Sequence, residues 1–355
     1  MKQRAERSVQ DGQTLFAAAN SGAGFVSFYD QVFDRKEIVR RYVIKGGPGT
    51  GKSSFMRAVA SYAEGLGLPV EVYRCSSDPD SVDGIVLDGR IAMMDGTAPH
   101  CVEPRVAGAR DELINLGEFW DGERLAERYN DIVSYQALKE ACYRRAYRFL
   151  SAATSVGENN RERIAPFLRL KKMQGAVERQ LRSIPDGAGF RLLPSFVSAV
   201  SMKGRVRLDT YEQRARHLVV LEDRYNTASV FLSLLLEEAR KKKCALRVSY
   251  DPVYPSLPEA VMLEESGACF VIGAHGDREP DACINMRRFL DWEGIKQVRA
   301  EYRISERMEE ALLDNATEAL SEAGRYHFEL EQIYVACMDF AAQQRFITSF
   351  CQKIR

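Results

Sequence analysis

The residues best suited to chemistry in this chain form a glycine-rich run that ends in lysine and serine. Residues 46–53 read GGPGTGKS and fit the pattern G-x-x-x-x-G-K-[ST], which is typical of a phosphate-binding P-loop. Glycines let the backbone curl until successive N–H groups point at one anion. A helix that begins at such a loop adds a partial positive charge. The residues predicted to bind a nucleotide are Gly46, Gly47, Pro48, Gly49, Thr50, Gly51, Lys52, Ser53 and Ser54.

A P-loop predicts ATP and Mg²⁺ as ligands. We expect Lys52 to reach the β- and γ-phosphates and the Ser53 hydroxyl to bind Mg²⁺. A second acid at the end of a neighbouring strand must hold the metal, and Asp95, which follows the apolar run 91–94, is the best candidate. The alternative is that Asp95 and Gly96 only form a turn, and Asp88 before Gly89 is a rival for the same role.

Further polar side chains follow the predicted strands at the edge where ligands bind in open α/β sheets. His100 is a candidate catalytic residue that would orient water or contact substrate, and Asp78 would contact metal or substrate. No glutamate follows Asp95, which favours a kinase-like protein or a slow hydrolase. Candidates for a cation on the transferred phosphate are Arg105, Arg110, Arg144, Arg145 and Arg148.

The elements that would position these residues alternate between strand and helix. Residues 41–45 read as a buried strand before the loop, and 54–65 as a helix after it; further strands are expected at 70–75 and 91–94. This order predicts the α/β class, with a parallel sheet covered by helices on both faces. Helical patterns follow at 122–153, at 154–183, where high charge suggests a solvated helix, and from 306 to about 355.

The sequence repeats itself weakly. With a shift of 176 residues, segment 41–104 aligns without a gap on 217–280, and ten pairs are identical, including Val43/Val219 and Phe55/Phe231. About four identities would be expected by chance at average composition. Upstream the shift becomes 180, as in the pair Phe16/Phe196. We therefore predict two tandem P-loop NTPase-like domains at 1–189 and 190–355, joined near a Pro- and Gly-containing linker at 183–189.

The second copy has lost the glycines and the lysine of its loop. Residues 222–229, which align with 46–53, read EDRYNTAS. Glu222 and Asp223 would repel phosphate, and bulky side chains disfavour the left-handed turns that a phosphate-binding loop needs. We therefore expect the second copy to fold without binding nucleotide.

Composition narrows the class of protein. The chain has 355 residues, 45% of them hydrophobic, and a formal net charge of zero, so no overall field favours nucleic acid or an anionic membrane. We expect no signal peptide at the charged N-terminus, no membrane-spanning stretch, and eight reduced cysteines. A cytoplasmic location is the corresponding expectation.

The chain resembles a poorly characterised bacterial family of tandem P-loop proteins, described as ATPases or nucleotide kinases. The resemblance rests on three segments: residues 41–53, residues 95–100 (DGTAPH) and residues 114–120 (INLGEFW). It implies a P-loop NTPase fold and nucleotide binding. Family members keep two intact P-loops, and this chain departs from that pattern in the second.

We therefore expect Mg-dependent ATP hydrolysis in the first domain. One alternative is a kinase for a small metabolite or nucleotide, with an acceptor pocket at Asp78 and His100. The other is an ATP-gated interaction module whose helical extensions bind a protein partner. No [NT]-K-x-D motif occurs, so nothing in the sequence indicates guanine specificity.

Overall fold

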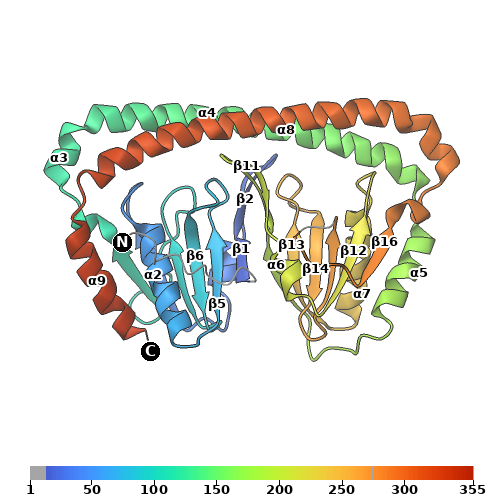
Figure 1. The fold of residues 1–355 in the computed structure, drawn as a ribbon, viewed down its shortest axis with the longest axis horizontal. Coiled ribbons are helices and arrows are strands. Elements are labelled where there is room, and N and C mark those ends of the chain that lie inside the picture. The colour runs from blue at the N-terminus through green and yellow to red at the C-terminus, as the bar shows by residue number, and fades with distance from the viewer. Residues whose placement is uncertain (1–12, 274–275, 355) are drawn as a thin grey trace.

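Two six-stranded sheets stand side by side beneath a pair of long helices (Figure 1). This computed structural model describes residues 13–273 and 276–354; the charged N-terminus considered above lies outside the described residues. Each sheet belongs to one half of the chain, and the long helices span both halves.

The first half builds one sheet and the helices directly connected to it. Its elements are β1 (Thr14–Phe16), β2 (Ala18–Ser21), β3 (Gly24–Ser27), α1 (Tyr29–Phe33), β4 (Arg40–Lys45), α2 (Lys52–Gly65), β5 (Val70–Arg74), β6 (Val82–Leu87), β7 (Ile91–Asp95), β8 (Asp111–Asn115) and the 3-10 helix η2 (Leu116–Phe119).

The strand order of the first sheet is β1-β5-β6-β7-β4-β8. The sheet is mixed, because β6 runs antiparallel to both of its neighbours. The expectation of a fully parallel sheet is therefore wrong. Residues 85–87 belong to a strand that the sequence pattern did not predict. Because a tight turn at Asp88 and Gly89 joins β6 directly to β7, the two strands must run antiparallel. The α/β class and the strand before the glycine-rich loop are confirmed.

The second half repeats this order of elements. They are β9 (Arg191–Ser195), β10 (Ser198–Ser201), β11 (Gly204–Arg207), α6 (Thr210–Arg214), β12 (His217–Glu222), α7 (Ala228–Lys241), β13 (Ala245–Tyr250), β14 (Pro258–Leu263), β15 (Ala268–Ile272), β16 (Ala282–Asn285) and the 3-10 helix η4 (Met286–Phe289). The strand order β9-β13-β14-β15-β12-β16 matches that of the first sheet, and β14 is again the antiparallel strand. The structure thus has the twofold organisation that the sequence repeat predicts.

Equivalent residues of the two halves meet at the centre of the molecule. The backbone N–H of Phe16 donates to the carbonyl oxygen of Phe196 at 2.8 Å, and the N–H of Phe196 donates to Phe16 at 2.9 Å. Such a reciprocal exchange is what an approximate twofold axis produces. Glu71 and Arg247, which are also equivalent under the 176-residue shift, form an ion pair at 2.6 Å.

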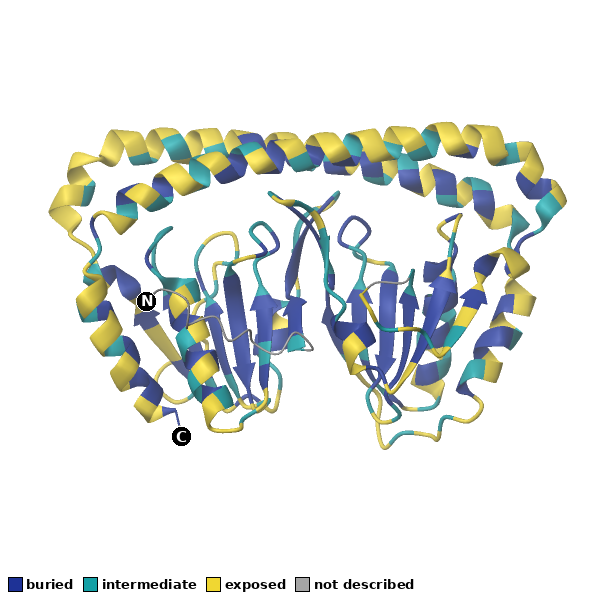
Figure 2. Ribbon diagram, viewed as in Figure 1, coloured by how far each residue is buried: buried dark blue, intermediate teal, exposed yellow. Residues whose placement is uncertain are grey.

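The two sheets share one continuous core between their inner faces. Side chains of both sheets, such as Val86 and Val220, pack there together with α1 and α6, represented by Phe33 and Tyr211. The inner strands of the two sheets are mostly buried, whereas the outer surfaces of the helices are exposed (Figure 2). The halves therefore form one packed body.

Six helices connect and cover the two sheets. They are α3 (Gly122–Glu127), α4 (Tyr129–Ile164), the 3-10 helix η3 (Ala165–Phe167), α5 (Leu170–Leu181), α8 (Trp292–Val335) and α9 (Phe340–Lys353). Helices α4 and α8 run antiparallel across the top of both sheets (Figure 1). Small side chains in the buried stripe of each helix, such as Ala146, Ala153, Ala316 and Ala323, let the two backbones approach closely.

The outer helix of each sheet comes from the other half of the chain. Helix α5, which follows the first half, packs on α7 of the second sheet, where Met173 and Val177 join the core. Helix α9, at the C-terminus, packs on α2 of the first sheet, where Ile347 and Phe350 join the core. The expectation of a solvated helix over 154–183 is wrong, since α5 buries one face.

Candidate functional site

The glycine-rich loop lies between β4 and α2, as predicted. Strand β4 is buried and lies between β7 and the edge strand β8, so it fixes where the loop begins. Gly51 precedes α2 with φ +80°, Gly49 has φ +68°, and no side chain caps the helix N-terminus. The first N–H groups of α2 are therefore available to an anion.

Lys52 extends back over its own loop. Its Nζ donates to the carbonyl oxygens of Gly46 and Gly47 at 2.8 and 2.9 Å, and lies 3.6 Å from Oδ2 of Asp95. The side chain is 14% exposed. The ammonium group therefore lies at the mouth of the loop, between the backbone and the acid that we expected to hold the metal.

Asp95 ends β7, the strand next to β4, and pairs in register with Ile44. Its Oδ1 accepts hydrogen bonds from the N–H and the hydroxyl of Thr97, while Oδ2 faces Lys52. The Ser53 hydroxyl oxygen accepts from the N–H of Val82 at 2.9 Å. The same oxygen accepts from Nε of Arg57 at 3.4 Å, so a metal would have to replace this longer hydrogen bond.

Asp88 is excluded as the rival acid. It follows β6, which runs antiparallel to β7, so it lies at the opposite end of the sheet from the loop. Its N–H donates to the carbonyl oxygen of Pro69, and its positive φ of 50° belongs to the turn before Gly89. Asp88 thus forms a turn far from the loop, while Asp95 lies beside the loop and also forms a turn through its hydrogen bond with the N–H of Thr97.

His100 lies at the expected edge but is held by its neighbours. Its Nε2 lies 2.9 Å from the hydroxyl of Tyr29 and 3.2 Å from Oδ2 of Asp83, and its ring stacks on Tyr29. Its Nδ1 is buried without a hydrogen-bond partner among the described residues. Burial, together with the carboxylates of Asp83 and Asp95, raises the pKa of Tyr29. The cluster of His100 and Tyr29 therefore lies near Asp95, the residue expected to hold a metal.

Parts of the second half cover the glycine-rich loop. A Cβ atom added to Gly47 would lie 2.8 Å from the Tyr334 ring of α8, and one added to Gly49 would lie 2.7 Å from the carbonyl oxygen of Glu331. Gln343 of α9 is buried and donates through Nε2 to the carbonyl oxygen of Thr50 at 2.6 Å. No local sequence pattern predicts these contacts, because they depend on how α8 and α9 return to the first sheet.

The hairpin β10–β11 also reaches the first site. Lys203, at its tip, forms ion pairs with Asp78 at 3.2 Å and with Asp80. Asp78 additionally accepts a hydrogen bond from Ser81. The carboxylate that we considered for metal or substrate is therefore already engaged by a cation from the other half.

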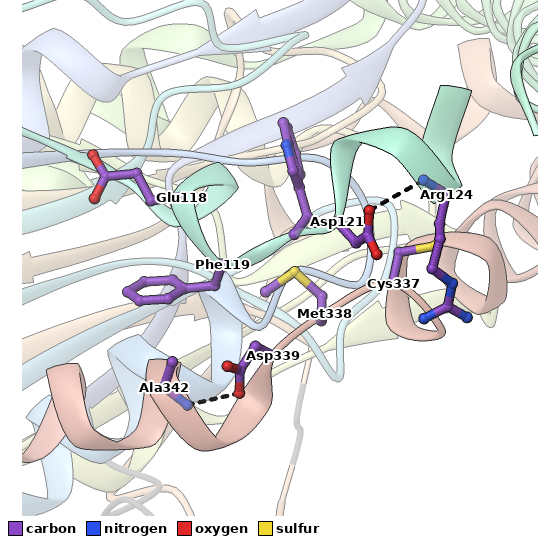
Figure 3. A pocket seen from close by; sticks show the side chains of 9 residues that line it. Glu118, Phe119, Asp121, Arg124, Cys337, Met338, Asp339 and Ala342 are labelled. Atoms are coloured by element: carbon purple, nitrogen blue, oxygen red, sulfur yellow. Dashed lines mark hydrogen bonds between the residues drawn. The ribbon is translucent and has the colours of Figure 1, made fainter. Parts of the chain in front are cut away.

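A groove of about 370 Å³ lies where the turn after η2 meets the turn between α8 and α9 (Figure 3). Two backbone hydrogen bonds join these turns, from Asp121 to Cys337 and from Asp339 to Phe119. Trp120 in the groove wall lies 5.8 Å, between ring centroids, from Tyr334, which connects it to the glycine-rich loop. Two acids in the groove have structural roles, since Asp121 accepts from the N–H of Arg124 and Asp339 from that of Ala342. The groove marks the seam where the C-terminal helix joins the first half.

The five arginines proposed as cations do not contact the loop in the described part of the chain. Arg105 and Arg110 pair with Asp34, and Arg145 pairs with Glu322. Arg144 and Arg148 are exposed on the outer face of α4.

In the second half, Asp223 occupies the place of an anion. Its Oδ2 accepts from the N–H of Ala228 at 2.6 Å, and its Oδ1 from the N–H of Tyr225 at 3.0 Å and the hydroxyl of Thr227 at 3.2 Å. The carboxylate thus takes the first N–H group of α7 and one N–H group of the preceding loop, where a phosphate would otherwise bind. Glu222 accepts from Asn285 instead.

Three further observations concern metal-binding clusters, membrane-spanning helices and similarity to known proteins. No cluster of three or more His, Cys, Asp or Glu side chains arranged for a metal is present in the ranges that the structure describes. No helix in these ranges is long and apolar enough to cross a bilayer. Comparisons with protein-family models, curated proteins and solved structures found no match to this chain.

Proposed function

We propose that the first half binds Mg·ATP at the loop between β4 and α2 and hydrolyses it. The observation that carries this proposal is the combination of an uncapped helix start, a lysine at the mouth of the loop, and an acid on the adjacent strand. Together these features offer backbone N–H groups and an ammonium to phosphate oxygens, and a carboxylate to a cation.

Each residue has a distinct role in this proposal. Lys52 exchanges its hydrogen bonds to Gly46 and Gly47 for the phosphates. Ser53 and Asp95 hold Mg²⁺, which supplies positive charge to the phosphate oxygens. The metal needs few protein ligands, because phosphate and water complete its shell.

We expect the hydrolysis of ATP to be slow. Gly96 follows Asp95, so the position where an adjacent acid would activate water carries no side chain. Among the alternatives, an ATP-gated interaction module has support in the contacts of Tyr334 and Gln343 with the loop, which connect the nucleotide site to α8 and α9. A kinase would need an acceptor pocket at Asp78 and His100, and both side chains are engaged by other residues.

Substitution of Lys52 by alanine tests the site. Lys52→Ala should abolish Mg·ATP binding and phosphate release almost completely, because the charge opposite the β- and γ-phosphates is lost. Isothermal calorimetry and a phosphate-release assay measure the two effects. Lys171→Ala, on an exposed position of α5, is the control and should behave as the wild type. Unchanged ATP affinity in Lys52→Ala would show that the nucleotide site is elsewhere or absent.

A further inference from the structure

The groove between the turn after η2 and the start of α9 adjoins the glycine-rich loop on two sides. Trp120 in the groove wall lies 5.8 Å, between ring centroids, from Tyr334, and the Tyr334 ring would lie 2.8 Å from a Cβ atom added to Gly47. On the opposite wall, Ala342 directly precedes Gln343, which donates to a carbonyl oxygen of the loop at 2.6 Å. One side chain thus separates the groove from the loop on each side, so a ligand bound at the loop can extend into the groove.

The equivalent seam of the second half is filled by a phenyl ring. In the first half the N–H of Asp121 donates to the carbonyl oxygen of Cys337 at 2.7 Å. In the second half the N–H of Asp291 donates to that of Phe167 at 2.8 Å, so Phe167 is the equivalent of Cys337. The Phe167 ring packs directly on Gly294, where an added Cβ atom would lie 2.1 Å from it. The first half has only a thiol at this position, and its seam is open.

Charge also distinguishes the two seams. In the second half, the guanidinium group of Arg169 lies 3.4 Å from the Asp291 carboxylate. Asp339 takes the position of Arg169 in the first half, two residues after the equivalent pair described above. Asp121 and Asp339 each use Oδ1 to cap a helix, and their Oδ2 atoms accept no hydrogen bond from any residue that the structure describes. Two carboxylate oxygens of the groove are therefore left to accept from a ligand.

Trp120 gives the groove an aromatic wall. The indole packs on Gly117, where an added Cβ atom would lie 2.8 Å from it, and is still 36% exposed. The equivalent residue of the second half, Leu290, is buried. Aromatic side chains stack on nucleobases, and carboxylates accept from the exocyclic amino groups of bases. A groove of about 370 Å³ is also large enough for a small-molecule ligand.

We propose that this groove binds the nucleobase of the nucleotide whose phosphates lie on the glycine-rich loop. Trp120 stacks on the base, and the carboxylates of Asp121 and Asp339 accept from an exocyclic amino group, which favours adenine over a base with an oxo group at that position. This inference rests on the proposed function. It accounts for the occurrence of the open groove and the glycine-rich loop in the same half, while side chains of the second half fill both positions there.

Substitution of Trp120 by alanine tests the proposal with two probes that share a triphosphate. Calorimetry would measure the dissociation constants of the magnesium complexes of a non-hydrolysable ATP analogue and of inorganic tripolyphosphate, which has no base. Trp120→Ala should weaken binding of the ATP analogue at least about tenfold and that of tripolyphosphate less than about threefold, as expected for the loss of one stacking contact. Trp120→Phe, which keeps an aromatic ring, should recover most of the lost affinity.

An analogue with hypoxanthine in place of adenine tests the carboxylates, because it carries an oxo group where adenine carries an amino group. The wild type should bind its magnesium complex at least about fivefold more weakly than that of the adenine analogue. The double variant Asp121→Asn/Asp339→Asn, in which asparagine still caps both helices, should lose this preference. Equal affinity of the wild type for the two analogues would refute the role of the carboxylates.

Tyr129→Ala is the matched control, because it removes an exposed aromatic side chain outside the groove. It should leave the dissociation constants of the ATP analogue and of tripolyphosphate unchanged. If Trp120→Ala weakens the two probes equally, or neither, while the wild type binds both, the role of the groove is refuted and the proposed function stands. If the wild type binds neither probe, the proposed function fails and this inference fails with it.

Discussion

At the scale of single residues, a carboxylate distinguishes the two halves. In the first half the start of α2 has no side-chain cap, whereas in the second half Asp223 accepts from the N–H of Ala228, the first residue of α7, and from the N–H of Tyr225 in the loop before it. A helix N-terminus attracts one anion, and in the second half that anion is part of the chain. Sequence alignment predicted the loss of the loop, and the structure adds how the vacated N–H groups are satisfied.

Asp95 and Asp88 are the two candidates for holding Mg²⁺, and their positions in the sheet distinguish them. Asp95→Asn should leave the fold intact and reduce ATP turnover at least about tenfold, because the carboxylate that holds Mg²⁺ loses its charge. Asp88→Asn should have little effect, since Asp88 lies at the other end of the sheet. Steady-state phosphate release measures both variants. The opposite ranking would transfer the metal role to Asp88 and contradict the geometry.

At the scale of elements, the site depends on helices that belong to the other half of the chain. Gln343 of α9 donates a buried hydrogen bond to the Thr50 carbonyl in the middle of the glycine-rich loop. Phe350 of the same helix packs edge-on against Tyr42 of β4 and Phe55 of α2. The C-terminal helix therefore supports the conformation of the loop.

Gln343→Leu should weaken binding of the non-hydrolysable ATP analogue several-fold and lower the thermal midpoint. The change leaves the buried Thr50 carbonyl without its donor, which costs on the order of 1–3 kcal/mol. Gln344→Leu, one residue further along and exposed, is the matched control. Calorimetry and thermal unfolding measure the two quantities. Equal behaviour of the two variants would show that α9 does not support the loop.

Local patterns in the sequence predicted the glycine-rich loop between a strand and a helix, the strands at 70–74 and 91–95, and the helical character of the later segments. They missed β6, because its run ends at Asp88 and Gly89 without a helix between it and β7. They also placed the last helix at 306, whereas α8 begins at Trp292 and a second helix, α9, follows it.

At the scale of the whole molecule, the halves are held together by contacts between equivalent residues. The Glu71 carboxylate lies 2.6 Å from Arg247 of the other half and 2.9 Å from Arg35. Burial alone would raise the pKa of Glu71, but these arginines lower it from its ordinary value of 4.5 to about 2. The exchange of α5 and α9 adds apolar packing to this polar contact. None of these long-range contacts could be predicted from local sequence.

Glu71→Gln should destabilise the fold by about 2–3 kcal/mol at pH 7, since a pKa below the unfolded value stabilises the folded state. That stabilisation is complete above about pH 4.5 and is lost as the pH falls through about 2. Denaturant unfolding at a series of pH values measures the gap between variant and wild type, which should narrow as the pH decreases. Glu112→Gln, in an exposed ion pair, should cost little at any pH. A pH-independent gap for Glu71→Gln would refute the assignment.

The central claim is that this two-sheet molecule has one nucleotide site, in the first half. Titration of the intact chain with the magnesium complex of a non-hydrolysable ATP analogue, followed by calorimetry, tests it most directly. We predict one site per chain, absent in Lys52→Ala, because Asp223 fills the corresponding position in the second half. Two sites per chain, with one surviving in Lys52→Ala, would contradict the account.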